Sequence, residues 1–347
     1  MVNGPPCMTA KICQADAGLV NEGDPMRHHY RGMAAMAVVA AAALLSGGCS
    51  ASAGPAGTLP VEKHDLVVGA VPVADAAALY IAKQQGLFTA QGLNVKIETV
   101  VSGADAIAGQ LTGKYDVVLG NYVSYILADA QQHDKFRVLA PAAAFSPNVS
   151  AVVVPAGSPI NTVTELKGKT IAVNALNNIA TLMVSSLLNA NAMGVQQNHI
   201  HFKVVPFPEM THALLTHQVD AAWMVEPFVT TAEMTGAQSV VDTDQGAAQN
   251  LPLAGYMVTQ SWEQKYPGTA AAFRRALREG QQVATQSISA VWHGVEAYAK
   301  IPASVAELIT LPNYPLTMSA IELQRVSDLM LDYNMIRHNF NAFQMVR

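Results

Sequence analysis

Residues 66–100 read LVVGAVPVADAAALYIAKQQGLFTAQGLNVKIETV, and this stretch decides the fold class. The run Leu66–Val71 is mostly apolar and has the composition of a buried strand. A helix is predicted over Ala76–Gln85, with Gly86 as its C-terminal stop. Apolar and polar residues then alternate over Leu93–Val100, which is typical of a second strand. A strand, a helix and a strand in this order indicate a parallel βαβ unit.

The same alternation of short apolar runs and helical stretches continues along the chain. Further strands are predicted at Asp116–Gly120, Arg137–Ala140, Ala151–Val154, Thr170–Val173, Phe202–Val205 and Ala221–Val225. Helices are predicted at 104–111, 180–190 and 210–216, and the chain is predicted to be mostly helical from Thr269, ending with 319–333. This order favours an α/β protein with a mainly parallel sheet.

Two blocks of similar sequence suggest that one structural plan is used twice. The blocks are Leu111-Thr-Gly-Lys-Tyr-Asp-Val-Val118 and Leu215-Thr-His-Gln-Val-Asp-Ala-Ala222. Each follows a predicted helix and leads through an aspartate into an apolar run. Two lobes built on the same plan would carry such equivalent elements. The alternative is coincidence, because short connections from a helix to a strand often contain Gly and Asp.

A hydrophobic run near the start of the sequence predicts export. Residues 33–49 (MAAMAVVAAAALLSGGC) follow a short basic stretch that opens at Met26. The apolar segment is too short for a bilayer, which takes roughly 20 residues. Its end resembles the bacterial lipobox, in which Cys49 would become the lipidated first residue of the mature chain, although Ser46 stands where an aliphatic residue is usual. An ordinary secretory signal cleaved nearby is the alternative.

The N-terminal region is therefore divided into two parts. Residues 1–48 are interpreted as an N-terminal extension with a lipoprotein signal, and residues 49–64 as a tether of linker composition. Met26 is the expected true start, with a genuine extension as the alternative. The sequence after Cys49 contains no cysteine, which suits an oxidising compartment. The expected location is the outer face of the cytoplasmic membrane, with a lipid anchor at Cys49.

Composition and motifs argue against several classes of function. The formal net charge of −5 argues against nucleic-acid binding, which depends on neutralising phosphates. The sequence contains no Gly-x-Ser-x-Gly elbow, no His-Glu-x-x-His pair and no Gly-rich phosphate loop. His199 and His201 would place two imidazoles on one face of a strand, which could form a metal-binding pair. The favoured interpretation is instead that both are solvent-exposed residues at the start of the strand. No catalytic residue, metal or cofactor is predicted.

Five short motifs occur in order between residues 66 and 340. They are 81–95 (IAKQQGLFTAQGLNV), Leu111–Val118, Leu166–Val173, Asp220–Pro227 and Val326–Ile336. Together they resemble the substrate-binding proteins of ABC importers for nitrate, sulfonates, taurine and thiamine-pyrimidine precursors. The resemblance implies a type II periplasmic-binding-protein fold, in which two crossover strands join two α/β lobes. With crossings near 147–150 and 256–259, lobe 1 is expected at 65–147 plus 259–347, and lobe 2 at 148–258.

In open α/β sheets, ligands bind beyond the carboxyl ends of the strands. The loops at those ends supply the candidate ligand-binding residues Asp75, Ser102, Gly103, Asn121, Tyr122, Asn148, Asn177, Asn178 and Glu226. Trp223, in the strand predicted at Ala221–Val225, is a further candidate because its ring could flank a flat ligand. These loops contain no Lys or Arg. An anion would therefore rest on the N–H groups of helix N-termini. The acids Asp75, Asp105 and Glu226 instead favour a ligand that carries an amine or a ring nitrogen.

Each candidate also has a purely structural interpretation. Asp105 would complement the dipole of its own helix. Glu226, which precedes a proline, would hydrogen-bond the hinge between the lobes. Tyr122 and Trp223 would pack in the core rather than flank a flat ligand. The sequence leaves these alternatives open.

The resemblance implies a lipid-anchored receptor that captures a small polar solute and works as a monomer. The receptor would pass the solute to a membrane permease driven by a cytoplasmic ATPase. One rival is an extracytoplasmic enzyme on the same scaffold. Pyrimidine-precursor synthases resemble this fold, but they rely on a cysteine-rich segment that is absent here. The other rival is a sensory module that presents its ligand to a signalling partner.

Overall fold

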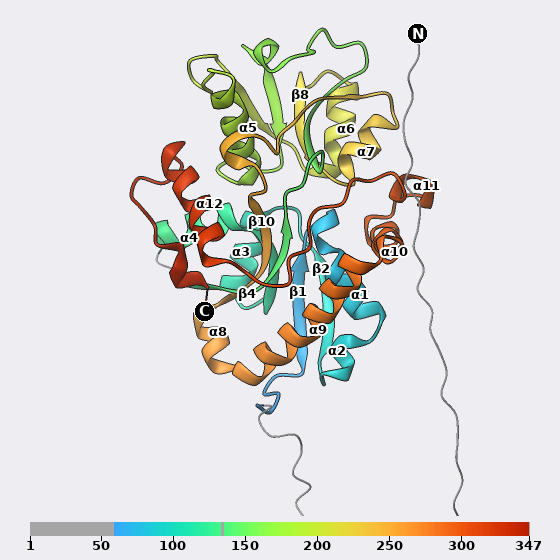
Figure 1. Cartoon of the computed structure of the whole chain (residues 1–347), viewed down its shortest axis with the longest axis vertical. Helices are drawn as coiled ribbons and strands as arrows, with labels where there is room; N and C mark the ends of the chain where they lie inside the picture. Colours follow the sequence, from blue (N-terminus) through green and yellow to red (C-terminus); the bar gives the residue numbers. More distant parts are fainter. Residues whose placement is uncertain (1–58, 133–134, 347) are drawn as a thin grey trace, which may run out of the picture. The chain divides into compact units, whose positions relative to one another are not determined.

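Two five-stranded sheets organise the protein (Figure 1), whose computed structural model describes residues 59–132 and 135–346. The first sheet has the order β2 (Asn94–Thr99), β1 (Asp65–Ala70), β3 (Val117–Asn121), β10 (Pro252–Thr259) and β4 (Phe136–Ala144). The second has the order β7 (His201–Val204), β6 (Thr170–Val173), β8 (Ala221–Val225), β5 (Ser150–Val154) and β9 (Gln238–Asp242). The predicted α/β class is confirmed.

Helices accompany both sheets. Those that follow strands of the first sheet are α1 (Ala77–Gln84), α2 (Leu87–Ala90), α3 (Gly103–Leu111), α4 (Tyr122–Gln132), α8 (Gln260–Lys265) and α9 (Pro267–Gln286), and the C-terminal part adds α10 (Ile288–Ala299), α11 (Ala303–Ala306) and α12 (Ala320–Asp332). Those of the second sheet are α5 (Ile179–Ala190), α6 (Phe207–Leu215) and α7 (Phe228–Glu233). Short 3₁₀ turns are η1 (Ala74–Ala76), η2 (Val163–Leu166), η3 (Gly246–Ala248) and η4 (Ala342–Met345). No helix within the described ranges is long and apolar enough to cross a membrane.

The two sheets have the same plan. In each sheet the first three strands in spatial order are parallel, and the fourth (β10 or β5) runs antiparallel to both of its neighbours. The aspartates of the two similar sequence blocks make equivalent bonds. Asp116 Oδ2 accepts from Val67 N at 3.0 Å, and Asp220 Oδ2 accepts from Thr170 N at 2.8 Å. Each aspartate ties the start of one strand to its parallel neighbour, which supports repetition over coincidence.

Strand pairing bears on one of the expected lobe boundaries. β10 pairs with β4 from Pro252 to Thr259 and with β3 from Ala254 to Met257, so residues 252–259 belong to the first sheet. The boundary expected at residue 258 lies at the end of this strand, and the crossing expected at 256–259 lies within it. The run PLAGYMVT is buried almost throughout, and such a run does not show from sequence which of two cores covers it.

Parts of the structure differ from the sequence prediction, which also contained no helix at α2, α7 or α8. The loop expected at Gly120–Tyr122 leads directly into α4, which the sequence did not predict. β9 was also missed, because it has a mostly polar and short sequence. His199 lies in a turn with φ of 51° before β7, so it does not share a strand face with His201, and both side chains are exposed. Within the described residues, no three His, Cys, Asp or Glu side chains are grouped to hold a metal ion.

Candidate ligand-binding cleft

The carboxyl ends of the parallel strands of both sheets border one cavity. Its lining comes from the first sheet and its helices, from the second sheet and its helices, and from β10: Val71, Val73, Asp75, Gly103, Leu119, Gly120, Asn121, Asn174, Ile179, Phe207, Trp223, Val225, Leu253 and Ala254. The cavity measures about 50 Å³, which is room for a few water molecules. This is the position at which open α/β sheets bind ligands.

Asp75 is the charged residue of this lining. It lies in η1, is 6 % exposed, and its carboxylate interacts with its own backbone N–H. Burial raises its pKa to about 7, because an ionised carboxylate loses its hydration there. Two tyrosines hold the turn in place: Tyr298 donates to Val73 O at 2.7 Å, and Tyr314 donates to Ala74 O at 3.0 Å.

Gly103 and Asn121 form a second polar corner of the cavity. Asn121 Oδ1 accepts from Ser124 N at 2.9 Å and thereby caps the start of α4. A Cβ on Gly103 would lie 3.2 Å from Asn121 Nδ2, so glycine lets the start of α3 approach the end of β3 closely. Ser102 caps α3 by accepting from Asp105 N at 3.2 Å and donates to Asp105 Oδ2 at 2.8 Å. The exposed Asp105 therefore serves its own helix.

The second lobe contributes an aromatic wall and an amide. Trp223 is fully buried, and its Nε1 donates to Thr243 Oγ1 at 3.1 Å. Its ring centroid lies 6.2 Å from that of Phe207. Asn178 caps α5 by accepting from Ala180 N at 3.0 Å, and its Nδ2 donates to Asn174 Oδ1 at 2.8 Å. Asn178 thus orients Asn174, which lines the cavity.

Glu226 links the two lobes instead of facing the cavity. It is 2 % exposed and follows β8. Oε1 accepts from Thr310 N at 3.1 Å and from Thr230 Oγ1 at 2.8 Å, while the backbone O accepts from Ala74 N at 2.9 Å. Burial raises the pKa of this carboxyl to about 7, against the opposing effect of the bonds from Thr230 and Thr310. These contacts agree with the hinge interpretation of Glu226.

A sequence profile described as NMT1/THI5 like matches residues 73–287, more than half of the chain. The chain belongs to the NMT1/THI5 like family. This confirms the resemblance that the five motifs indicated. The putative binding protein YtlA of Bacillus subtilis (strain 168) is 22 % identical over 206 residues, which are 59 % of this chain and 61 % of that relative.

Solved structures share the fold of this NMT1/THI5 like chain. The alkanesulfonate-binding protein SsuA of Xanthomonas axonopodis pv. citri, bound to MOPS, superposes with a TM-score of 0.71 at 17 % identity, covering 83 % of this chain and 99 % of that chain. The nitrate-binding protein NrtA of Synechocystis PCC 6803 gives 0.70 at 14 % identity, covering 83 % and 87 %. The two-lobed type II fold of periplasmic binding proteins is thereby confirmed.

Six of the ten predicted residues lie outside the lining of the cavity: Ser102, Asn178 and Glu226, described above, and Tyr122, Asn148 and Asn177. Tyr122 is 1 % exposed, and its hydroxyl donates to Met318 Sδ at 3.2 Å inside the first lobe. Asn148 is exposed in the first crossover with φ of 65°, and Asn177 is exposed with φ of 52°. Both asparagines occupy left-handed turn positions, for which this residue type is suited irrespective of any ligand.

Sequence reasoning missed most of the apolar wall of the NMT1/THI5 like cleft. Ile179, Phe207, Leu253 and Ala254 line the cavity, yet an apolar residue near a strand end carries no sign of ligand binding. Asn174 had a signal, because it directly follows β6. The lining therefore combines one buried carboxyl and two amides with hydrophobic surface, and it contains no Lys or Arg.

Proposed function

We propose that this chain is an extracytoplasmic solute-binding protein of an ABC importer, which captures a small polar solute between its lobes. The observation that carries the proposal is the cavity formed by the facing strand ends of both sheets. A solute held there contacts both lobes, so its binding energy favours the arrangement in which they meet. A permease that recognises this arrangement would receive only the loaded protein.

The solute we propose carries an amine or a ring nitrogen. Asp75 is buried in the lining, and neither Lys nor Arg balances its charge there. A cationic or hydrogen-bond-donating group on the solute would stabilise the ionised carboxylate. The opposing candidate is a sulfonate or nitrate, which two relatives bind according to their names. Such an anion would sit at the start of α3 or α5, with Asp75 protonated.

The contacts we propose follow the lining of the cavity. Asp75, Gly103, Asn121 and Trp223 would contact the solute. Ser102, Asn178 and Glu226 would act indirectly, because they cap helices or join the lobes. Tyr122, Asn148 and Asn177 stay predictions without support from this cavity.

Export and lipid anchoring complete the proposal. Met26, Cys49 and the signal segment lie outside the described residues, so the sequence pattern alone supports them. The mature chain would work as an anchored monomer beside its permease and ATPase. Mass measurement of the mature N-terminus tests the anchor, since an unmodified Cys49 contradicts it. A sensory module with the same cavity is the second candidate, and permease genes beside this gene would speak against it.

Two pairs of ligands test the solute class in thermal-shift titrations of the chain from Ser50. Taurine is compared with ethanesulfonate, and an aminopyrimidine with pyrimidine, so each pair differs by one amino group. At about 100 times its dissociation constant, a ligand adds roughly 2.7 kcal/mol, which raises the midpoint by a few degrees. We expect the amino compound of one pair to give the larger shift. Its binding should tighten as the pH rises through about 7, where Asp75 loses its proton.

The variant Asp75→Asn provides the control for this experiment. The amide keeps the shape of the side chain but cannot carry the negative charge, so the preference for the amino compound should disappear. Stronger shifts with ethanesulfonate or nitrate would contradict the amine proposal while leaving solute binding intact. Absence of any ligand-induced shift with a broad solute panel would contradict the binding function itself.

A further inference from the structure

A basic groove lies on the first lobe, apart from the residues that line the ligand cavity. Its volume is about 650 Å³, and its walls come from β4, α9 and the segment 315–318. The charged side chains in its lining are Arg137, Arg274, Arg275, Arg278 and Glu263. Four arginines against one glutamate give the groove a formal charge of +3, whereas the whole chain carries −5. The groove is thus an exception to the mild acidity of the molecule.

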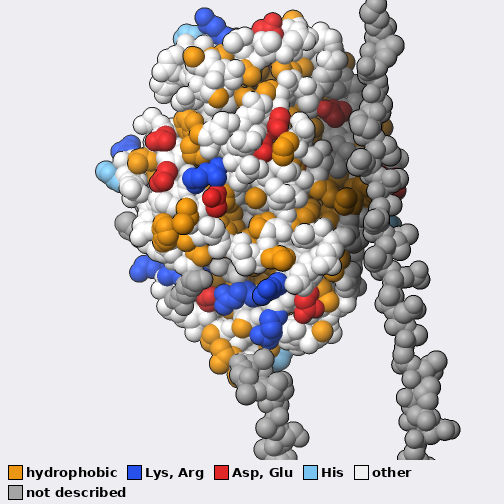
Figure 2. All heavy atoms as spheres, viewed as in Figure 1, with side chains coloured by type: hydrophobic (Ala, Val, Ile, Leu, Met, Phe, Trp, Pro, Cys, Tyr) orange, Lys and Arg blue, Asp and Glu red, His pale blue; other side chains and the backbone are white. Residues whose placement is uncertain are grey.

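The guanidinium groups of the groove are held at its surface. Arg274 pairs with Glu263 at 2.9 Å, and Arg275 Nε donates to Gln91 Oε1 at 2.7 Å. Arg278 is exposed. Within residues 59–132 and 135–346, neither Arg275 nor Arg278 forms an ion pair. Figure 2 shows Lys and Arg side chains gathered over the region of α9. Two cations are therefore available to an external anion.

The floor of the groove is rigid. Gln281 is 2 % exposed and lies one turn beyond Arg278 on α9. Its Nε2 donates to three backbone oxygens, those of Pro141, Ala142 and Pro315, at 2.9–3.1 Å. These bonds join α9 to β4 and to the segment 315–318. The arginines are consequently presented by a fixed surface rather than by a loop.

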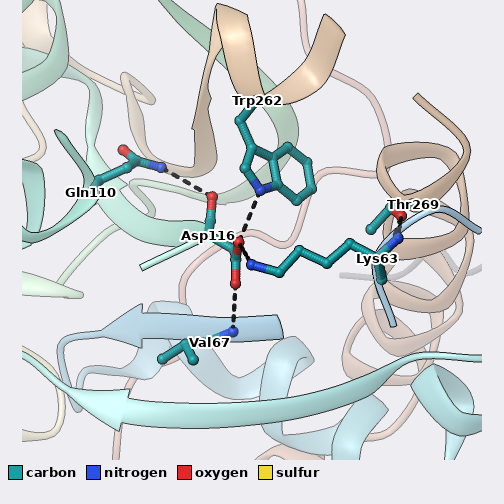
Figure 3. A network of polar contacts seen from close by, with 6 residues as sticks. All are labelled: Lys63, Val67, Gln110, Asp116, Trp262 and Thr269. Atoms are coloured by element: carbon teal, nitrogen blue, oxygen red, sulfur yellow. Dashed lines mark hydrogen bonds and ion pairs between the residues drawn. The ribbon is translucent and has the colours of Figure 1, made fainter. Parts of the chain in front are cut away.

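The chain enters the body beside α9. The Glu62 carboxylate accepts from Gly268 N at 3.0 Å and from Thr269 N at 2.8 Å, at the first turn of this helix. Next to it, the Lys63 ammonium pairs with Asp116, whose Oδ1 also accepts from Trp262 Nε1 at 2.9 Å (Figure 3). These contacts fix the point at which the described chain begins relative to the basic groove.

The distance from Cys49 to this entry point is limited by chain length. Leu59 follows Cys49 by ten positions, so the chain between them can span at most roughly 35 Å. If Cys49 is lipidated, as the proposed function holds, the end of the body that carries α9 stays close to the membrane surface.

We propose that the basic groove binds the phosphate-bearing head groups of anionic lipids and so orients the tethered protein on the membrane. The inference rests on the lipid anchor in the proposed function. Arginine matches phosphate oxygens through paired N–H groups. Attraction to an anionic leaflet acts within a Debye length, which is about 8 Å at physiological salt. The short tether allows the groove to come within this distance of the leaflet. The described chain enters at the first turn of α9, and Arg275 and Arg278 lie further along the same helix.

Vesicle co-sedimentation tests the groove with the chain from Ser50, which lacks the lipid. Vesicles contain either phosphatidylglycerol and phosphatidylcholine in equal parts or phosphatidylcholine alone. We expect binding to the anionic vesicles at low NaCl concentration, a loss of binding at high NaCl concentration, and no binding to neutral vesicles. The double variant Arg275→Gln and Arg278→Gln should bind about 25-fold more weakly, since each arginine contributes about fivefold.

A matched double variant controls for total charge. Lys167→Gln and Lys203→Gln remove two exposed cations from the second lobe and should leave vesicle binding unchanged. Equal losses in both double variants, or binding to neutral vesicles, would overturn the proposal. Thermal-shift titration of each variant with taurine and with the aminopyrimidine measures solute binding separately from vesicle binding. It therefore distinguishes failure of the groove proposal from failure of the proposed function. A chain that binds solute but no anionic vesicle refutes the groove and leaves the proposed function standing.

Discussion

Asp75 lies at a buried position, where ionisation of its carboxyl group costs free energy. The side chain is buried beside hydrophobic surface, and its pKa is raised from 3.8 to about 7. The folded chain therefore holds a proton on Asp75 between about pH 4 and pH 7, whereas the unfolded chain has already released it. Since stability falls wherever the native state binds more protons than the unfolded state, Asp75 makes the free energy of unfolding decrease as the pH rises through this window.

At the scale of this residue, Asp75→Asn should flatten the pH dependence of stability. The contribution of Asp75 to the free energy of unfolding should fall by about 2.5 kcal/mol from pH 5 to pH 8, because one pKa unit corresponds to about 1.4 kcal/mol. Urea denaturation at both pH values measures the difference. Asp332→Asn, at an exposed position, should leave the wild-type slope intact. Identical slopes for wild type and Asp75→Asn would contradict a buried, protonated Asp75.

The helix α4 shows how an element is fixed by contacts that a linear pattern does not reveal. It lies against two strands through two tyrosines, each of which faces a glycine. A Cβ on Gly120 of β3 would lie 2.5 Å from Tyr125 Cε2, and a Cβ on Gly255 of β10 would lie 2.8 Å from Tyr122 Cε1. Both positions need glycine for space. Tyr122 is thus a core residue of the first lobe. This agrees with the structural interpretation of Tyr122 rather than with its role beside a flat ligand.

At the scale of this element, Gly255→Ala should destabilise the protein by about 1–3 kcal/mol, because the new methyl group overlaps the ring of Tyr122. Chemical denaturation measures the change. Gly294→Ala in α10 is the matched control, since its nearest side-chain atom, Ile81 Cγ1, lies 3.9 Å from the added carbon. Alanine is the better helix former there, so this variant should gain about 0.5–1 kcal/mol. Destabilisation by both variants to the same extent would refute the packing argument.

At the scale of the whole molecule, Glu226 connects the lobes at the side of the cavity. Its backbone O and Oε1 accept from Ala74 and Thr310, which belong to the first lobe, while Thr230 holds the same carboxylate from the second. Asp75 lies next to Ala74. Glu226 therefore bonds to the turn that carries Asp75, the residue that we propose as the solute contact. We expect solute binding to be coupled to the arrangement of the lobes through this contact.

Glu226→Gln should shift the ligand-free protein toward more open arrangements. The amide cannot accept from Thr310 N and Thr230 N as the carboxylate does, and a hydrogen bond to a charged group is worth about 1.5–3 kcal/mol. Small-angle scattering should report a larger radius of gyration, and solute affinity should fall by about tenfold or more. Glu233→Gln, whose carboxylate contacts Ser239 within the second lobe, is the control. Unchanged scattering for Glu226→Gln would remove Glu226 from the hinge.

The cleft shows which of its lining residues could be predicted from the sequence. Asp75, Gly103, Asn121 and Trp223 were predicted at strand ends, and the structure places all four on one cavity. Their position at this cavity could be expected because a strand end is a local property with a direction in the fold, whereas their contact with a solute stays a prediction. Phe207 and Leu253 could not be predicted, because an apolar side chain is as common in a core as in a binding site. Their role depends on which strands from distant parts of the chain become neighbours.

The sequence by itself determined the α/β class, the repeated plan and the family, because these depend on local periodicity and on motifs in a fixed order. The tertiary structure alone decided which sheet takes β10, that Tyr122 packs inside the first lobe, and that Glu226 joins the lobes while Asp75 faces the cavity. The physical reason is that these outcomes are set by burial and by hydrogen bonds between residues far apart in the chain. A linear pattern records neither.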